Sequence, residues 1–504
     1  MTGENGNIIF DEIPVDRLEP GTFLEVKPNY TETGLLPMPV RNLIIGPKLP
    51  EGRLEAGKIV EITRGEDAQV YFGRGSIGAA MATTFRKANK SQPLYIMAID
   101  DAADGVAAEG SIAFSGSVTN STTLRFLVAG NEVRFNAPAG ASGDLLANRL
   151  ATAINENLDL PVTATTAGAT VKTICRHKGE IGNDIDLRVY DKAQPLPIGL
   201  AVNITPMAGG SGNPALQAAL DQITNSWYTT IVQPFSDASN ITAFATFLQD
   251  QFLATQKMDA IGFTFKSGSY ADLSAFGALT NCAQLVCSGV DGSPTPSWVM
   301  AASAGAVAAF HLANDPSRQL KSLVLPSVIA PDEHDQFIDV EKDNLLRRGI
   351  TTLNCLPDGA VTFSRVISTY KTNNLGIDDR AWLDIMTTAT MTRIRYDFSS
   401  YLGLLYPRAK LASDESPALS AIAFDTEGNL SNAIVTPRIM AAVWAGRCRL
   451  YANNTWIVNV EKTVKQSSFH IAENDKNRLE AKMVIDIVGN LMVFAGSLEF
   501  KARS

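Results

Sequence analysis

The chain has 504 residues, of which 45% are hydrophobic and 19% are charged. This composition is typical of a protein with buried cores, and it excludes a wholly disordered chain. The length allows roughly two to four domains. The formal net charge of −9 argues against a general nucleic-acid-binding protein, which would need clustered lysine and arginine.

Three features indicate where the chain folds. Residues 1–21 lack the basic and apolar regions of a signal peptide. The longest apolar run, Trp298–Ala313, is too short and too rich in alanine to span a bilayer, so we expect a buried helix and no membrane insertion. The cysteines are odd in number and form no CxxC motif, which favours reduced, buried thiols in a cytoplasm. They are Cys175, Cys282, Cys287, Cys355 and Cys448.

The first segment of the chain, residues 1–22, is polar and acidic. It contains asparagine, glycine and proline, and such a segment cannot form a core by itself. Its one short apolar run is Ile8, Ile9 and Phe10. We therefore expect an N-terminal arm that becomes ordered on a partner.

An alternation of strand and helix patterns follows the arm. Apolar runs read as strands, and helical spacing such as that of Ile241, Phe244 and Leu248 lies between them. Nearly continuous apolar strands that alternate with helices predict a doubly wound, mostly parallel α/β sheet over residues 23–104 and 206–375. The predicted strands are Phe23–Lys27, Leu43–Ile45, Leu94–Ile99, Thr229–Val232, Ile261–Phe265, Leu285–Val290, Leu323–Leu325 and Val361–Ile367.

Residues 105–205 interrupt this alternation. They are rich in threonine, glycine and valine, and they hold one clear helical pattern, Asp144–Asn157. The alternation resumes after Gly209–Gly212, with Asn213 as the expected cap of a helix over Ala215–Ser226. We therefore expect an inserted, peripheral, β-rich domain.

Residues 376–496 show a third pattern, which predicts an α+β domain. Asp378 is expected to cap a long helix that carries Trp382 and Ile385, and a second helix is expected over Pro437–Asn453. The strands predicted after these helices are Trp456–Val460, Met483–Val488 and Leu491–Phe500.

The last residues, 497–504, form a second candidate arm. Leu498 and Phe500 alternate with Glu499 and Lys501, as expected for a strand with one buried face. An exposed terminal strand is an edge that needs a partner. We predict that both ends of the chain couple copies to one another by strand addition.

A GxGxxG motif, Gly73–Gly78, is the main indication of an enzyme. It opens a helical stretch, and Asp100 lies at about the distance of the acid in a dinucleotide-binding fold. The apolar run before it, Val70–Phe72, is short, and Arg74 places a bulky side chain in the turn. The alternative is a tight turn that needs the conformational freedom of glycine.

Other catalytic patterns are missing from the sequence. No Walker lysine follows Gly209–Gly212, and there is no GxSxG elbow. None of the four histidines, His177, His311, His334 and His470, lies in an HExxH motif or beside a cysteine pair. The sequence thus predicts neither a bound cofactor nor a zinc site.

The C-terminal region carries the basic surplus of the chain. From Pro437 to Ser504, ten basic side chains stand against six acidic ones, in a chain whose net charge is −9. One interpretation is an ordinary solvated surface, and the other is contact with acidic surfaces of a partner. The candidate contact residues are Arg438, Arg447 and Arg449 on or beside the second helix, and Lys476 and Arg478 in a polar loop.

Several short stretches carry a resemblance to a known family. They are Phe72–Ser76, Asp315–Leu320, Glu341–Thr351, Asp358–Tyr370, Gly376–Asp379, Trp382–Ile385 and Val435–Pro437. In this order and spacing they resemble the contractile phage tail sheath family, most closely its Mu-like branch. The insert, with Lys178–Asn183, is similar to the added domain that many sheath proteins carry.

The resemblance implies a structural subunit and not an enzyme. Copies would form sixfold rings, stacked helically around an inner tube, and would contract to drive the tube through a cell envelope. Baseplate and tail terminator proteins would be further partners, with no direct contact to nucleic acid. The protein would be assembled in the bacterial host cytoplasm and would lie in the tail of a virion or a bacteriocin-like particle.

The resemblance also implies a subtilisin-like, non-catalytic core and a C-terminal domain that faces the tube. A subtilisin-like hydrolase and an NAD-binding oxidoreductase are the alternatives, although no sequence context marks a serine, histidine and aspartate set. The five basic candidates named above would then be tube-facing.

Overall fold

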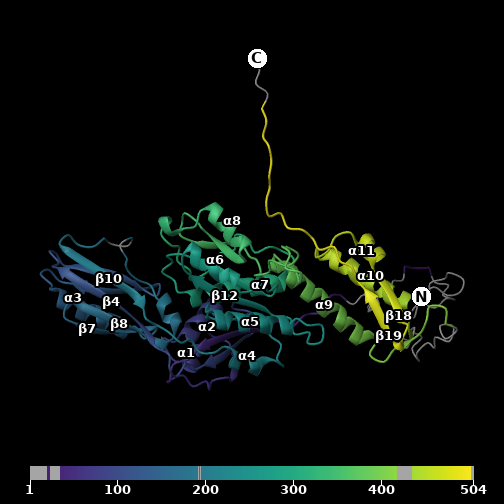
Figure 1. The fold of residues 1–504 in the computed structure, drawn as a ribbon, viewed down its shortest axis with the longest axis horizontal. Helices are drawn as coiled ribbons and strands as arrows, with labels where there is room; N and C mark the ends of the chain where they lie inside the picture. Colours follow the sequence, from purple (N-terminus) through teal and green to yellow (C-terminus); the bar gives the residue numbers. More distant parts are fainter. Residues whose placement is uncertain (1–19, 23–33, 191, 193–194, 417–433, 501–504) are drawn as a thin grey trace, which may run out of the picture.

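The computed structural model describes residues 20–22, 34–190, 192, 195–416 and 434–500. Phe23–Lys27 and the apolar run of the N-terminal arm lie outside these residues. The molecule is elongated (Figure 1), with the strands of residues 107–208 at one end, an α/β core in the middle and the last helices at the other end.

An eight-stranded mixed sheet forms the centre of the molecule, in the order β15-β14-β13-β12-β11-β1-β3-β2. Its six inner strands run parallel, and the edge strands β2 and β15 are antiparallel to their neighbours. The strands are β1 (Asn42–Pro47), β2 (Ile59–Ile62), β3 (Leu94–Ile99), β11 (Thr230–Val232), β12 (Ile261–Ser267), β13 (Leu285–Val290), β14 (Ile350–Cys355) and β15 (Val361–Arg365). The predicted α/β class is confirmed.

Helices cover both faces of this sheet. A Cβ on Gly305 of α7 would meet Val232 and Phe263, whereas a Cβ on Gly262 would meet Phe244 of α5. Since neighbouring strand residues point to opposite faces, α7 and α5 lie on opposite sides. The core helices are α1 (Asp67–Phe72), α2 (Ile77–Ala88), α4 (Gln217–Ile223), α5 (Ala238–Gln251), α6 (Tyr270–Ala278), α7 (Ser297–Asn314) and α8 (Asp339–Arg347). The predicted buried helix over Trp298–Ala313 is confirmed as most of α7.

The described residues between 107 and 208 contribute no strand to the central sheet. They form a four-stranded sheet, β10-β4-β8-β7, and a three-stranded sheet, β6-β5-β9, and α3 (Gly143–Glu156) contacts both. Val106 and Ser211 pair with each other, so the two ends of the segment meet. The strands are β4 (Ala107–Gly116), β5 (Thr122–Val128), β6 (Asn131–Ala137), β7 (Val162–Ala167), β8 (Thr170–Lys178), β9 (Leu187–Val189) and β10 (Leu200–Ala208).

The C-terminal part has a separate apolar cluster, which includes Phe398, Trp444 and Tyr451. The long helix α9 (Ile385–Leu405) joins it to the core, because Ile385 and Met386 belong to the core cluster and Phe398 to the C-terminal one. The other elements are α10 (Pro437–Asn453), α11 (Val460–Gln466), β16 (Lys410–Leu411), β17 (Ile434–Val435), β18 (Ser468–Ala472) and β19 (Asp475–Lys482).

Several predicted elements are wrong in detail. The long helix begins after Asp384 and not at Asp378, since residues 371–379 form a turn in which Asn373 accepts the backbone N–H groups of Leu375 and Ile377. Asn213 does not cap a helix; its amide donates to Asp237. The predicted strands Trp456–Val460 and Met483–Val488 are reduced to one bridge between Ile457 and Ile487, and Leu323–Leu325 to a bridge at Val324.

Candidate functional site

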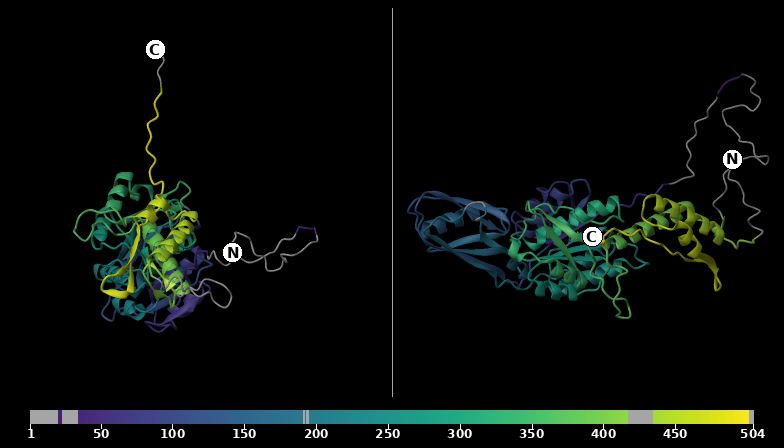
Figure 2. Two further views of the ribbon diagram at one scale, coloured as in Figure 1. Left: turned by 90° about the vertical axis from the view of Figure 1, so that its right-hand side faces the viewer. Right: turned by 90° about the horizontal axis from the view of Figure 1, so that it is seen from above.

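The end of the described chain, residues 489–500, forms a tail that runs away from the body (Figure 1). Figure 2 shows the same departure from two other sides. Phe494 is 85% exposed, Leu498 is fully exposed, and Phe500 is 89% exposed. The residues predicted as a terminal strand thus pair with no strand within the described chain.

The hairpin of β18 and β19 in the C-terminal part pairs with no further strand of the described residues. It is a two-stranded sheet in which Ser468 pairs with Lys482 and Ile471 with Leu479. Phe469 and Leu479 pack against the C-terminal apolar cluster, which holds one side of the hairpin in place. A two-stranded ribbon with open edges can accept further strands.

Four of the five basic candidates lie on the surface of the C-terminal part. Arg438 is in the first turn of α10, and Arg449 is near the end of that helix. Lys476 and Arg478 lie on β19 and not in the predicted loop, and Arg478 pairs with Glu480 at 2.9 Å. These four side chains can reach a partner.

Arg447 is a correction to the sequence-based prediction, because it is buried and cannot face a tube. Its Nε donates to Asp397 at 3.0 Å, and Nη2 donates to the same carboxylate at 2.6 Å. Tyr451 also donates to Asp397, at 2.7 Å, and burial raises the pKa of this tyrosine, which keeps it protonated. Asp397 was not among the predicted residues, although a lone acid between Ile394 and Phe398 on an apolar helix face was the available signal.

The same buried pair holds the beginning of the described N-terminal segment. The backbone N–H of Leu36 donates to Asp397 at 2.8 Å, and Arg447 donates to the carbonyl of Gly34 at 3.3 Å. Leu35 packs against the C-terminal apolar cluster. The segment that precedes the core sheet is therefore held by the C-terminal part before it reaches β1.

The glycine motif at 73–78 does not form a dinucleotide site. It connects α1 to α2, whereas the dinucleotide fold requires a strand before the glycines. A Cβ on Gly75 would lie 2.5 Å from the carbonyl oxygen of Leu158, so backbone of the insert occupies the space next to the turn. Arg74 forms an ion pair with Asp159, which is also in the insert. The motif is a tight junction between the core and the insert.

A histidine–aspartate pair exists, but its geometry does not suit a serine protease. His177 is fully buried, and its Nδ1 lies 2.9 Å from Asp101. Its Nε2 accepts the backbone N–H of Ile77 at 3.2 Å, so the nitrogen that would take a proton from a serine is already in use. His177 therefore links β8 of the insert to the start of α2.

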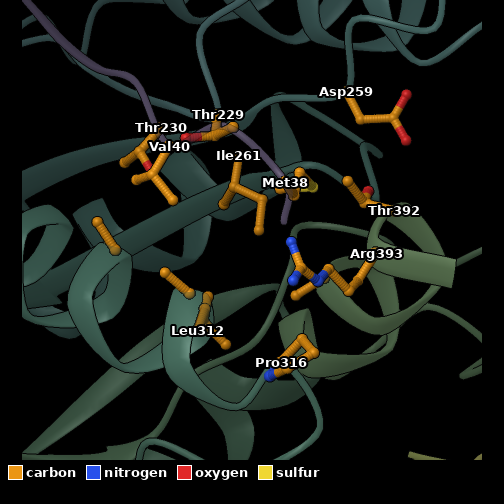
Figure 3. A pocket seen from close by; sticks show the side chains of 13 residues that line it. Met38, Val40, Thr229, Thr230, Asp259, Ile261, Leu312, Pro316, Thr392 and Arg393 are labelled. Atoms are coloured by element: carbon orange, nitrogen blue, oxygen red, sulfur yellow. The ribbon is translucent and has the colours of Figure 1, made fainter. Parts of the chain in front are cut away.

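A small apolar cavity between the core and α9 is shown in Figure 3. Its volume is about 60 Å³, far below the several hundred Å³ of an ordinary ligand pocket. The carboxylate of Asp259 points away from the cavity and pairs with Arg395 of α9. The lining includes Met38, Ile261 and Leu312, so this is a packing gap where α9 meets the core.

Within the described residues, no cluster of histidine, cysteine or acidic side chains has the arrangement of a metal site. No helix in that part of the chain is long and apolar enough to cross a membrane. The five cysteines are free, and burial raises the pKa of Cys282 to about 12, which makes this thiol unreactive.

Two comparisons of the sequence with known proteins identify the family. Residues 209–369 match the model of the phage tail sheath protein central domain. A Mu-like prophage FluMu tail sheath protein of Haemophilus influenzae is 31% identical over 435 residues, which cover 86% of this chain and 87% of that protein.

Two solved structures are similar at lower levels. The sheath tail protein Lin1278 of Listeria innocua has 13% identity and a TM-score of 0.47, with 91% of this chain and 94% of that chain covered. The sheath of an extracellular contractile injection system, PVC, in its contracted state has 9% identity and a TM-score of 0.47, with 96% and 98% covered. On its sequence relationship to the Haemophilus protein, the chain belongs to the phage tail sheath protein family and is a structural subunit of a contractile tail sheath.

Proposed function

We propose that copies of the chain assemble as stacked sixfold rings around an inner tube and contract to drive that tube through a cell envelope. The observation that carries this proposal is the tail, where Phe494, Leu498 and Phe500 are exposed on an extended segment. Apolar side chains in this arrangement need a partner, and a neighbouring copy that adds the tail as a strand would supply one.

Strand addition suits a lattice that changes its shape. Main-chain hydrogen bonds along an added strand hold two subunits together without requiring one fixed orientation of their globular bodies. The hairpin of β18 and β19 is the acceptor that we propose on the neighbouring copy, because no other strand of the described chain pairs with it. Ile8, Ile9 and Phe10 lie outside the described residues, and we propose that they act as a second coupling arm.

The four exposed basic residues support a C-terminal domain that faces the tube. Arg438, Arg449, Lys476 and Arg478 would meet an acidic tube surface. We place the remaining partners, the baseplate and tail terminator proteins, at the two ends of the ring stack. Assembly would take place in the bacterial host cytoplasm, without direct contact to nucleic acid and without membrane insertion.

The core in this proposal is a subtilisin-like scaffold without catalysis. The blocked Nε2 of His177 supports that assignment, as does the packing of the insert against the glycine turn. Contraction would draw its energy from repacked subunit interfaces, so no nucleotide or cofactor takes part. We also propose that residues 105–205 and 376–496 are separate domains of each subunit.

Removal of the tail tests the proposal. A variant that ends at Met492 should unfold at the same temperature as the 504-residue chain, because Phe494, Leu498 and Phe500 are exposed to solvent. The same variant should form no sheaths in electron microscopy, alone or with tubes. Sheaths of normal length that still contract would contradict the proposal.

A further inference from the structure

The base of the tail passes from the C-terminal domain to the core. Ile487 pairs with Ile457, and Val488 donates to the carbonyl of Trp456 at 3.1 Å, so the chain up to residue 488 belongs to the C-terminal domain. The next contacts are with the segment Asp315–Leu320 of the core. The tail therefore leaves the body from a core loop.

The side-chain amide of Asn490 forms two hydrogen bonds with the core at the point where the chain leaves the C-terminal domain. Its Nδ2 donates to the carbonyl of Ser317 at 2.9 Å, and its Oδ1 accepts the backbone N–H of Gln319 at 3.2 Å. The side chain of Gln319 adds a third hydrogen bond, which its Nε2 donates to the carbonyl of Leu491 at 3.1 Å. Met492 packs against the core cluster, and the next residue, Val493, is 77% exposed.

The core loop Asp315–Leu320, to which Asn490 binds, is held in place by its own contacts. It follows α7, whose first thirteen residues are almost all buried. Asp315 accepts the N–H and the hydroxyl of Ser317 at 3.1 and 2.9 Å, and the same hydroxyl reaches the carbonyl of Thr455 at 3.4 Å. Leu320 is 1% exposed and anchors the other end of the loop. The core, the C-terminal domain and the tail thus meet at this loop.

We propose that Asn490 and Gln319 are positioning residues, which fix the point and the direction in which the tail leaves the subunit. The inference rests on the proposed function of the tail as a coupling arm. A tail directed by three hydrogen bonds samples fewer orientations than a free one, so less entropy is lost when it binds a neighbour. We call these three hydrogen bonds the clamp. Because the clamp ties the tail to the core, the origin of the tail moves with the core when a subunit rotates.

Assembly of an Asn490→Ala variant is the first test. Its thermal unfolding should match that of the wild type, while the subunit concentration needed for sheath assembly rises about tenfold, in line with the loss of two hydrogen bonds. Asn490→Asp keeps the acceptor for Gln319 and should give a smaller rise. Gln319→Ala removes only the bond from Nε2 to the carbonyl of Leu491, because its backbone N–H still donates to Asn490, and it should give a smaller rise than Asn490→Ala. Asn344→Ala, at an exposed position of α8, is the matched control and should change nothing.

The direction of the tail can also be measured in the free subunit. Spin labels at Lys321→Cys and Phe494→Cys, in a Cys355→Ser background, should show a narrow distance distribution that broadens when Asn490→Ala is added. An unchanged distribution, or normal assembly despite a broadened one, would overturn the clamp. If the variant that ends at Met492 assembled normally, the coupling role of the tail would fail instead, and the distance measurement would still decide whether Asn490 directs the tail.

Discussion

The core sheet buries its apolar side chains, whereas the end of the described chain exposes them. β13 is buried at all six of its positions, and most of α7 is buried as well. In the tail, by contrast, Phe494, Leu498 and Phe500 are at least 85% exposed. The core is completed by its own chain, whereas the apolar side chains of the tail are left exposed by the rest of the described chain. We therefore expect folding of the subunit and assembly of the sheath to be separable.

We expect the largest effect on folding from breaking the buried ion pair of Asp397 and Arg447. Asp397→Ala leaves Arg447 buried without its carboxylate, and it also removes the bonds to Leu36 and Tyr451. We expect a loss of about 3–5 kcal/mol in the free energy of unfolding of this domain, measured by urea denaturation.

The control for this variant is Asp343→Ala, which breaks the exposed pair with Arg347. That change should cost no more than about 0.5 kcal/mol. Equal losses in the two variants would show that the pair of Asp397 and Arg447 does not hold the C-terminal domain together.

A deletion of the insert should have an intermediate effect. Val106 and Ser211 are paired, so a short glycine and serine linker can replace residues 107–210. The N–H of Ile77 loses its acceptor, His177, which should cost about 1–3 kcal/mol. We expect a soluble subunit with a lower unfolding temperature that still assembles into sheaths. An insoluble product would mean that the insert and the core fold as one unit.

Reversal of the exposed basic charges should have the smallest effect. We expect the quadruple change of Arg438, Arg449, Lys476 and Arg478 to glutamate to weaken co-sedimentation with tubes several-fold. The effect should be larger at low salt, since exposed charges are screened within about 10 Å at 0.1 M. Arg447 is left unchanged, because its reversal would test folding and not the surface. Binding that is equal to wild type at low salt would contradict a tube-facing role.

Local signals in the sequence were sufficient for several elements. The helix predicted over Pro437–Asn453 is α10 with the same bounds, because Thr436 caps it and proline occupies its first turn. The alternating strands and helices of the core were predicted for the same reason, since apolar runs and helical spacing are local patterns. The family resemblance gave the function, which the sequence comparison confirmed.

Features that depend on distant contacts could not be predicted. Arg447 and Arg449 are two residues apart on one helix, and only the position of Asp397 on α9 decides which of them is buried. The start of α9 was placed at Asp378 and not at Asp384, because Asn373 makes a local turn and Asp384 pairs with Arg365. The hairpin of β18 and β19 was missed, since β19 is almost entirely polar.

Hydrogen exchange of the tail tests the central claim most directly. The amides of Phe494–Phe500 should exchange rapidly in the free subunit, where the tail pairs with no strand of the described chain. In the assembled sheath the amides on one edge of the tail should be protected, because strand addition places them in main-chain hydrogen bonds with a neighbour. Equally rapid exchange in subunit and sheath would contradict the claim that the tail couples one copy to the next.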